Sequence, residues 1–267
     1  MHRQTQVKTG KSWFEDMRCR LLASSPAFAV LPEGSNERDQ GEIGDRLQDL
    51  SARDRAVLAA CMRRKGYVDD LVNAFAKFSS FLSMAPGTTV VDVGGGPFTA
   101  GLALAKMIGD EAKFRYFGIE QTDAMRALGA AIAREVKALS HLDPRTEIDF
   151  HASLDEMDFD PKPSEELIVF VLPYLLSGSP VDVGALVKDM AKARRRIGWG
   201  TAAVLYSNSE RVVPKAIFSE FKNRMEDVGF RMIVKDSEIS CESEGLRETR
   251  YAIFRQLSVA NIPVSRS

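Results

Sequence analysis

The sequence predicts an α/β fold: a doubly wound, mostly parallel seven-stranded sheet with a C-terminal antiparallel hairpin and a helical N-terminal extension. From residue 88 onward, short runs of apolar and β-branched residues alternate with helical patterns, which is typical of a parallel sheet covered on both faces. Three consecutive glycines follow the first expected strand and lead into a helix. Two strand patterns close the domain with no helical pattern between them, which predicts an antiparallel pair at the sheet edge.

The elements follow from hydrophobic spacing and turn residues. The expected strands are 88–93, 114–119, 146–151, 167–171, 202–206, 231–240 and 250–257, and the polar segment 241–248 is the expected hairpin loop. The expected helices are 68–83, one ending near 108, 123–139, 183–195 and 214–228. We therefore expect a main domain over 68–257, a helical N-terminal extension or lid over 1–67 with helices at 12–22 and from Ser51, and a tail over 258–267.

Composition narrows the class of protein. The chain has 267 residues, 45% hydrophobic and 27% charged, with a net charge of −1, so no basic field indicates DNA binding. The longest apolar run, 167–176, is broken by Pro173 and falls short of the roughly 20 residues that a membrane span needs. The three cysteines are isolated, which fits a reducing, cytoplasmic setting and gives no metal site. A homodimer is left open.

The glycine turn is the strongest functional signal. Asp92 ends a buried strand, and Gly94, Gly95 and Gly96 follow before a helical run. Glycines let a ligand approach the backbone closely, and a helix start offers free N–H groups. A carboxylate at this position would repel a pyrophosphate but suits a ligand that carries an ammonium group. These residues favour S-adenosylmethionine over a dinucleotide.

This arrangement resembles the class I S-adenosylmethionine-dependent methyltransferases over about residues 68–257. In that family an acidic residue that closes the second strand holds the ribose hydroxyls, and here that position is Glu120, 28 residues after Asp92. The resemblance implies that Gln121 borders the adenosine, that Ser153 in the loop after strand three contacts the adenine, and that Leu172 lies at the cofactor at the end of strand four. It implies methyl transfer to an O or N atom of a small molecule, protein or RNA.

The sequence departs from the family pattern just after the glycines. Phe98 stands where many members carry a third glycine, and Pro97 removes one N–H from the turn. The Phe98 ring either narrows the methionine end of the pocket or packs under the following helix.

Candidates for catalysis are weaker. Methyltransferases that act on amino nitrogens often carry Asn/Asp-Pro-Pro-Tyr after strand four, but this chain has Val171-Leu172-Pro173-Tyr174 and lacks the polar residue. Tyr174 could lie beside the methyl group, or it could simply pack in a turn at the strand end. His151 is a second candidate, as a general base.

Two other interpretations of the function stay open, and a third fails. The runs 96–100 and 174–177 resemble the methyltransferase-like proteins of small-ribosomal-subunit assembly, which implies an rRNA-related role. A second interpretation is an inactive S-adenosylmethionine-binding assembly or interaction protein. An NAD-dependent enzyme fails because Thr99 replaces the last glycine of its motif.

Basic residues occur in two clusters, 63–65 and 192–196. Each cluster fits the C-terminus of a helix, where positive charge is favoured, or else a contact to RNA or phosphate.

Overall fold

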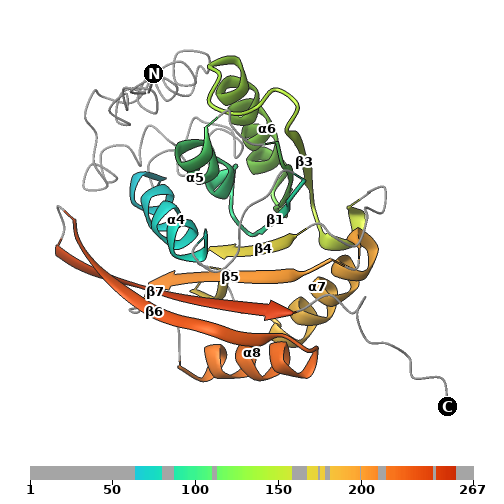
Figure 1. The fold of residues 1–267 in the computed structure, drawn as a ribbon, viewed down its shortest axis with the longest axis vertical. Coiled ribbons are helices and arrows are strands. Elements are labelled where there is room, and N and C mark those ends of the chain that lie inside the picture. The colour runs from blue at the N-terminus through green and yellow to red at the C-terminus, as the bar shows by residue number, and fades with distance from the viewer. Residues whose placement is uncertain are drawn as a thin grey trace, which may run out of the picture.

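The structure is a computed structural model that describes residues 64–79, 87–109, 113–157, 167–173, 175–177, 181–198, 200–209, 215–242 and 245–256. Within these residues, seven strands form one sheet in the order β3-β2-β1-β4-β5-β7-β6 (Figure 1). The strands are β1 Thr89–Val93, β2 Arg115–Ile119, β3 Glu147–His151, β4 Ile168–Pro173, β5 Ala202–Ser209, β6 Arg231–Glu242 and β7 Gly245–Gln256. The helices are α4 Arg64–Ser79, α5 Thr99–Ile108, α6 Asp123–Ala138, α7 Val183–Ile197 and α8 Lys215–Asp227, with short 3-10 turns η3 Leu154–Glu156 and η4 Leu175–Ser177.

The five strands β1 to β5 are mutually parallel, and β7 pairs antiparallel to β5. Every residue of β1, β2 and β4 is buried, as expected for strands covered on both faces. The predicted fold class is confirmed in this part of the chain. Strand order reverses at β1, which lies between β2 and β4, and ligands of open α/β sheets bind outside the carboxyl ends of strands at such a point.

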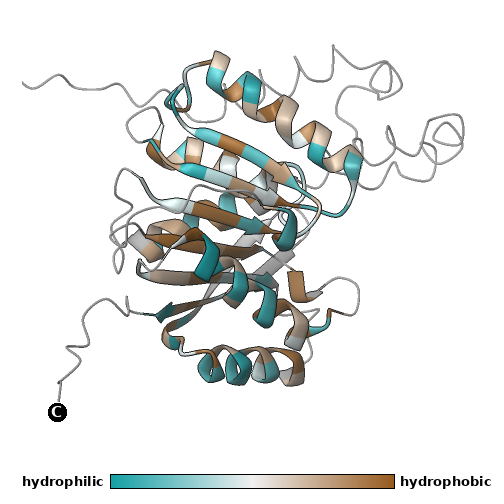
Figure 2. Ribbon diagram, turned by 90° about the vertical axis from the view of Figure 1, so that its right-hand side faces the viewer, coloured by the Kyte–Doolittle hydropathy of each residue, from teal (hydrophilic) through white to brown (hydrophobic). Residues whose placement is uncertain are grey.

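Two hydrophobic layers hold the helices against the sheet. One layer joins α4, α5 and α6 to one face, and the other joins α7, α8 and η3 to the opposite face. Figure 2 shows hydrophobic segments along the central strands and mixed colouring along the covering helices. Helix α4 belongs to the first layer, because Leu71, Phe75 and Phe78 are fully buried there. The helix begins at Arg64, four residues before its expected start, and Val68 is the first of its residues described as buried.

The hairpin is present, but its predicted loop is wrong. Residues 241–248 are polar, and we expected them all to lie in the loop, yet Cys241 pairs with Leu246 and Glu242 with Gly245. Only residues 243–244 lie between the two strands. Ladder hydrogen bonds use backbone groups alone, so polar side chains on an edge hairpin do not end the pairing.

Other boundaries moved by a few residues. Strand β4 runs two residues beyond its expected end and β5 runs three, to Ser209. The helices expected at 12–22 and from Ser51, and the tail 258–267, lie outside the described residues. No helix within the described ranges is long and apolar enough to cross a membrane.

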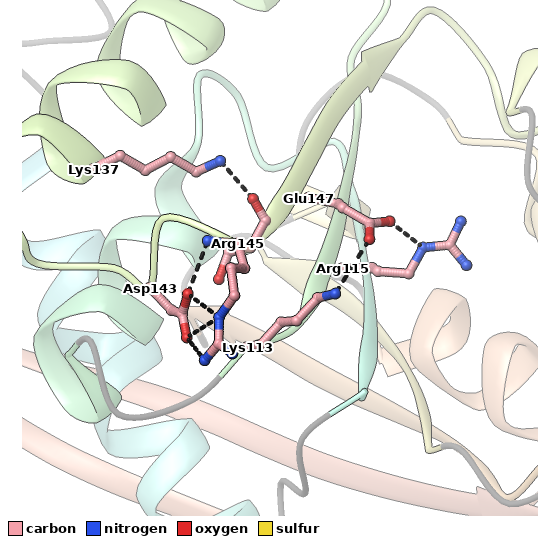
Figure 3. A network of polar contacts seen from close by, with 7 residues as sticks. Lys113, Arg115, Lys137, Asp143, Arg145 and Glu147 are labelled. Carbon is pink, nitrogen blue, oxygen red and sulfur yellow. Dashed lines mark hydrogen bonds and ion pairs between the residues drawn. The ribbon is translucent and has the colours of Figure 1, made fainter.

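Ion pairs occupy the amino-terminal edge of β2 and β3, the edge opposite the glycine turn (Figure 3). Arg115 lies directly across from Glu147, and their Nε and Oε2 atoms are 3.1 Å apart, while Lys113 approaches the same carboxylate at 3.6 Å. Beside them, Arg145 donates hydrogen bonds to Asp143 and holds the pKa of that carboxyl at about 2. The charged groups at this edge therefore bind one another and stabilise the start of two strands.

Candidate functional site

The glycine turn lies at the carboxyl end of β1, and its conformation requires residues that tolerate positive φ. Gly94 has φ +70°, Gly96 has φ +62° and Phe98 has φ +76°. The Gly94 N–H donates to the Ile119 carbonyl at 2.8 Å, which joins the turn to the end of β2. The turn is therefore held against the carboxyl end of β2.

Asp92 lies beneath this turn rather than at its outer surface. Its side chain is buried, and its Oδ2 accepts hydrogen bonds from the Tyr116 hydroxyl at 2.6 Å and the Ala100 N–H at 3.3 Å. Its Oδ1 is buried and has no hydrogen-bond partner among the described residues. Burial raises the pKa of Asp92 to about 7 and the negative charge of Glu120 adds to the rise, while the two hydrogen bonds oppose it.

Gly95 is required by that carboxylate. A Cβ at Gly95 would lie 2.1 Å from both oxygens of Asp92, so no other residue fits without moving the acid. Gly94 is exposed, but a Cβ there would lie 2.6 Å from Cδ1 of Leu175. Leu175 follows β4 and covers Gly94. Sequence reasoning missed this residue, because only the parallel pairing of β1 with β4 brings it to the turn.

Phe98 packs under the following helix, which is one of the two alternatives that its position allowed. Its ring is fully buried, with its centroid 4.8 Å from that of Tyr116 and 6.1 Å from that of Phe150. A Cβ on Gly101, one turn further along α5, would lie 2.0 Å from the ring. The ring thus points away from the mouth of the turn, into the layer of α4, α5 and α6.

Three N–H groups in and after the turn already have partners within the protein. Gly94 donates to Ile119, Phe98 to the Gly96 carbonyl and Ala100 to Asp92, and Pro97 has no N–H. A pyrophosphate at a helix start depends on such donors and on the absence of a nearby acid. The geometry adds a second reason, beyond the missing glycine, against a dinucleotide.

Glu120 lies directly after β2, on the rim beside Gly94. Its main-chain N–H donates to the His151 carbonyl at 3.0 Å, and its Oε1 accepts from the Thr122 N–H at 3.0 Å. Arg126 donates to the carbonyls of Glu120 and Gln121, at 2.6 and 2.9 Å. The backbone that presents Glu120 is held on both sides, and Gln121 is exposed next to it.

The loop after β3 adds Ser153 to the same edge. Ser153 is half-buried and precedes η3, and its hydroxyl caps no N–H of that turn. Glu156 instead closes the loop, because its Oε2 accepts from the Ala152 N–H at 3.1 Å. The His151 ring lies 6.0 Å from that of Phe117, and its buried Nε2 has no hydrogen-bond partner within the described ranges.

Of the two candidates at the end of strand four, the structure describes Leu172 but not Tyr174. Leu172 is fully buried in the layer of α7 and α8, so only its main chain can face a ligand. Tyr174 lies outside the described residues, and its catalytic role stays a hypothesis. Among the residues that the structure describes, no group of three or more His, Cys, Asp or Glu could hold a metal ion.

Comparisons with known proteins give structural likeness only. No family model and no curated protein matches the sequence. One similar solved structure is a SAM-dependent methyltransferase from Aquifex aeolicus, at 14% identity and TM-score 0.45, over 76% of this chain and 99% of that one. An arsenic(III) S-adenosylmethionine methyltransferase from Chlamydomonas reinhardtii matches at 15% identity and TM-score 0.45, over 67% and 66%. A putative sarcosine dimethylglycine methyltransferase from Galdieria sulphuraria matches at 10% and 0.46, over 71% and 86%. Identities this low say nothing about a substrate.

Proposed function

We propose that this chain binds S-adenosylmethionine at the carboxyl edge of β1, β2 and β3 and transfers its methyl group to an acceptor. The observation that carries the proposal is the pairing of an open glycine turn with the Glu120 carboxylate. The hydrogen bond from Gly94 to Ile119 places the two side by side. An ionised carboxylate makes strong, charge-assisted hydrogen bonds to vicinal hydroxyl groups, which is what a ribose presents.

The rest of the edge fits the other parts of that ligand. Gln121 is exposed directly after Glu120, and Ser153 is half-buried in the loop after the neighbouring strand β3, so in this proposal the adenosine lies against these two residues. Gly94, Gly95 and Gly96 would pass under the methionine part. The buried Asp92 carboxyl lies beneath the turn and holds its shape, because it accepts hydrogen bonds from the Ala100 N–H and the Tyr116 hydroxyl.

Transfer itself needs little from the protein beyond alignment. The methyl–sulfur bond breaks as the bond from the acceptor atom to the methyl carbon forms, and the sulfonium becomes a neutral thioether. An O–H or N–H acceptor loses its proton to a base or to water. The edge at β4 supplies no described polar side chain for that step, because Leu172 and Pro173 are buried and apolar.

The lack of a described polar side chain at the end of β4 supports a second function. A protein that binds S-adenosylmethionine without transferring its methyl group, and serves as an assembly or interaction module, needs the same cofactor edge and no base. RNA, protein and small-molecule acceptors all stay open, although the net charge of −1 weakens RNA relative to the others, and a ribosome-assembly role is one form of the proposal. A cytoplasmic location and a homodimer belong to the same proposal.

Calorimetric titration with S-adenosylhomocysteine and with NAD tests the proposal. We expect micromolar or tighter binding of the first and no heat from NAD. Tight NAD binding without S-adenosylhomocysteine binding would overturn the assignment.

The Glu120→Ala variant tests the residue that carries the proposal. Removing one partner of a charge-assisted bond costs about 1.5–3 kcal/mol, so affinity for S-adenosylhomocysteine should fall roughly ten- to hundredfold. Glu220→Ala is the matched control, because Glu220 is an exposed acid on α8 whose ion pair among the described residues is with Arg224 of the same helix. An unchanged dissociation constant in Glu120→Ala would mean that Glu120 only ends a strand.

A further inference from the structure

Arg196 reaches from the last turn of α7 to the loop that follows β3, about 40 residues earlier in the chain. Its Nη1 donates to the carbonyl of Asp155 at 3.1 Å and to that of Leu154 at 3.4 Å. Its Nη2 donates to the carbonyl of Met157. One guanidinium thus binds three carbonyls of a single short loop.

Other polar contacts of the loop are the hydrogen bond from the Ala152 N–H to Glu156 and the approach of Lys192 to Asp155 at 3.8 Å. Turn η3 has only three residues, and the carbonyls at the end of any helix lack partners within it. A planar guanidinium, with several N–H donors in a fixed fork, can bind such a group of carbonyls together. Leu154 and Met157 are buried against the second layer and anchor the loop from below. Ser153, the polar residue near the start of the loop, stays half-buried at the carboxyl edge of the sheet.

Two basic residues near Arg196 also have partners within the protein, which argues against a phosphate-binding patch here. Arg194 is buried and donates to the Gly200 carbonyl at 3.3 Å, and Lys192 lies 3.3 Å from Asp189 and 3.8 Å from Asp155. Lys192, Arg194 and Arg196 therefore each have partners within the protein, although Arg196 is exposed like its neighbour Arg195. The cluster serves the fold and the loop rather than an RNA surface.

We infer that Arg196 is a positioning residue of the cofactor site: it fixes loop 152–157 so that the loop selects adenine. This inference rests on the proposed function, because the adenine would lie against Ser153. Arg196 touches no part of the ligand itself and acts through the loop carbonyls. Its loss should therefore weaken recognition of the base more than recognition of the rest of the cofactor.

The test compares two ligands that differ only in the base, S-adenosylhomocysteine and S-inosylhomocysteine. The wild-type protein should prefer the adenine compound. In Arg196→Ala, affinity for S-adenosylhomocysteine should fall about tenfold, while affinity for the inosine compound falls much less, so that the preference is mostly lost. Arg195→Ala, at the exposed neighbouring position, should behave as wild type in both titrations.

Arg196→Lys is the second variant, which keeps the charge and the stem in case Arg196→Ala does not fold. A single ammonium can reach fewer of the carbonyls, so this variant should show an intermediate preference for adenine. Equal losses for both ligands in both variants would overturn the inference and leave Arg196 a general stabiliser of the fold. A wild-type protein that binds neither ligand would refute the proposed function instead, and the two failures are thus distinguishable.

Discussion

The carboxyl group of Asp92 is buried beneath the glycine turn, where it accepts hydrogen bonds from Tyr116 and Ala100. Its burial favours the protonated form, so the folded protein binds a proton there more tightly than the unfolded chain does. The folded state therefore gains stability from this group at low pH. Deprotonation near pH 7 would place an uncompensated charge under the turn.

Stability should fall with rising pH because of this one residue. The pKa of Asp92 is about 7 in the folded state against an ordinary value of 3.8, so its contribution is complete below pH 3.8 and is lost as pH rises through 7. The full change corresponds to about 4 kcal/mol. We expect the free energy of unfolding of wild type, measured by urea denaturation from pH 5 to 8, to decline relative to that of Asp92→Asn.

The comparison between variants isolates Asp92 from the other titrating groups. Asp149→Asn, at an exposed position on β3, should follow the wild-type pH profile. Parallel profiles for wild type and Asp92→Asn would show that the acid does not titrate in this range.

At the scale of elements, the join between the glycine turn and α5 depends on one aromatic ring. Phe98 adopts a left-handed conformation that costs a residue with a side chain roughly 1–2 kcal/mol, and the buried ring offsets this strain. Gly101 provides the space that the ring fills. The Phe98 ring and the space at Gly101 therefore complement each other, at the position where the family pattern has a glycine instead of Phe98.

Gly101→Ala should therefore destabilise the protein, although Gly to Ala within a helix ordinarily stabilises it by about 1 kcal/mol. The added Cβ would lie 2.0 Å from the Phe98 ring, and overpacking of this kind costs roughly 1–3 kcal/mol. In a Phe98→Ala background the ring is gone, so the same substitution should become neutral or stabilising. Denaturant unfolding of the four proteins in this double-mutant cycle measures the change of sign. The same destabilisation in both backgrounds would refute the pairing.

Much of this element scale could be predicted from the sequence, because periodicity and turn residues are local. The strand ends at Val93, Ile119 and His151 lie where the apolar runs stop. Local patterns could not predict contacts between distant segments. Examples are the contact of Leu175 with Gly94 and that of Arg196 with the loop after β3. The position of Asp92 could be predicted along the chain, but its burial depends on Tyr116, 24 residues away.

At the scale of the whole molecule, α4 is part of the packed core. Its buried side chains Leu71, Ala74, Phe75 and Phe78 complete the layer that also holds α5. The proposed cofactor edge consists of β1, β2 and β3 and the turns that follow them, all of which come after α4.

Two deletions test where the domain starts. Removal of residues 1–45 should leave S-adenosylhomocysteine affinity within a few fold, because the cofactor edge and α4 are intact, while any acceptor contacts made by the extension are lost. Removal of residues 1–78 takes away several fully buried side chains, each worth about 2–5 kcal/mol, and should abolish folding. Circular dichroism and calorimetry distinguish the two. A shorter protein that folds and binds without α4 would contradict this domain boundary.

A crystal structure of the protein with S-adenosylhomocysteine is the most direct test of the cofactor edge. The ribose hydroxyls should lie within hydrogen-bonding distance of the Glu120 carboxylate, with the adenine against Ser153 and the homocysteine over Gly94. The Phe98 ring should stay beneath α5, and the Arg196 guanidinium should stay on the loop carbonyls. A ligand bound at another edge of the sheet, or with its ribose away from Glu120, would contradict the assignment.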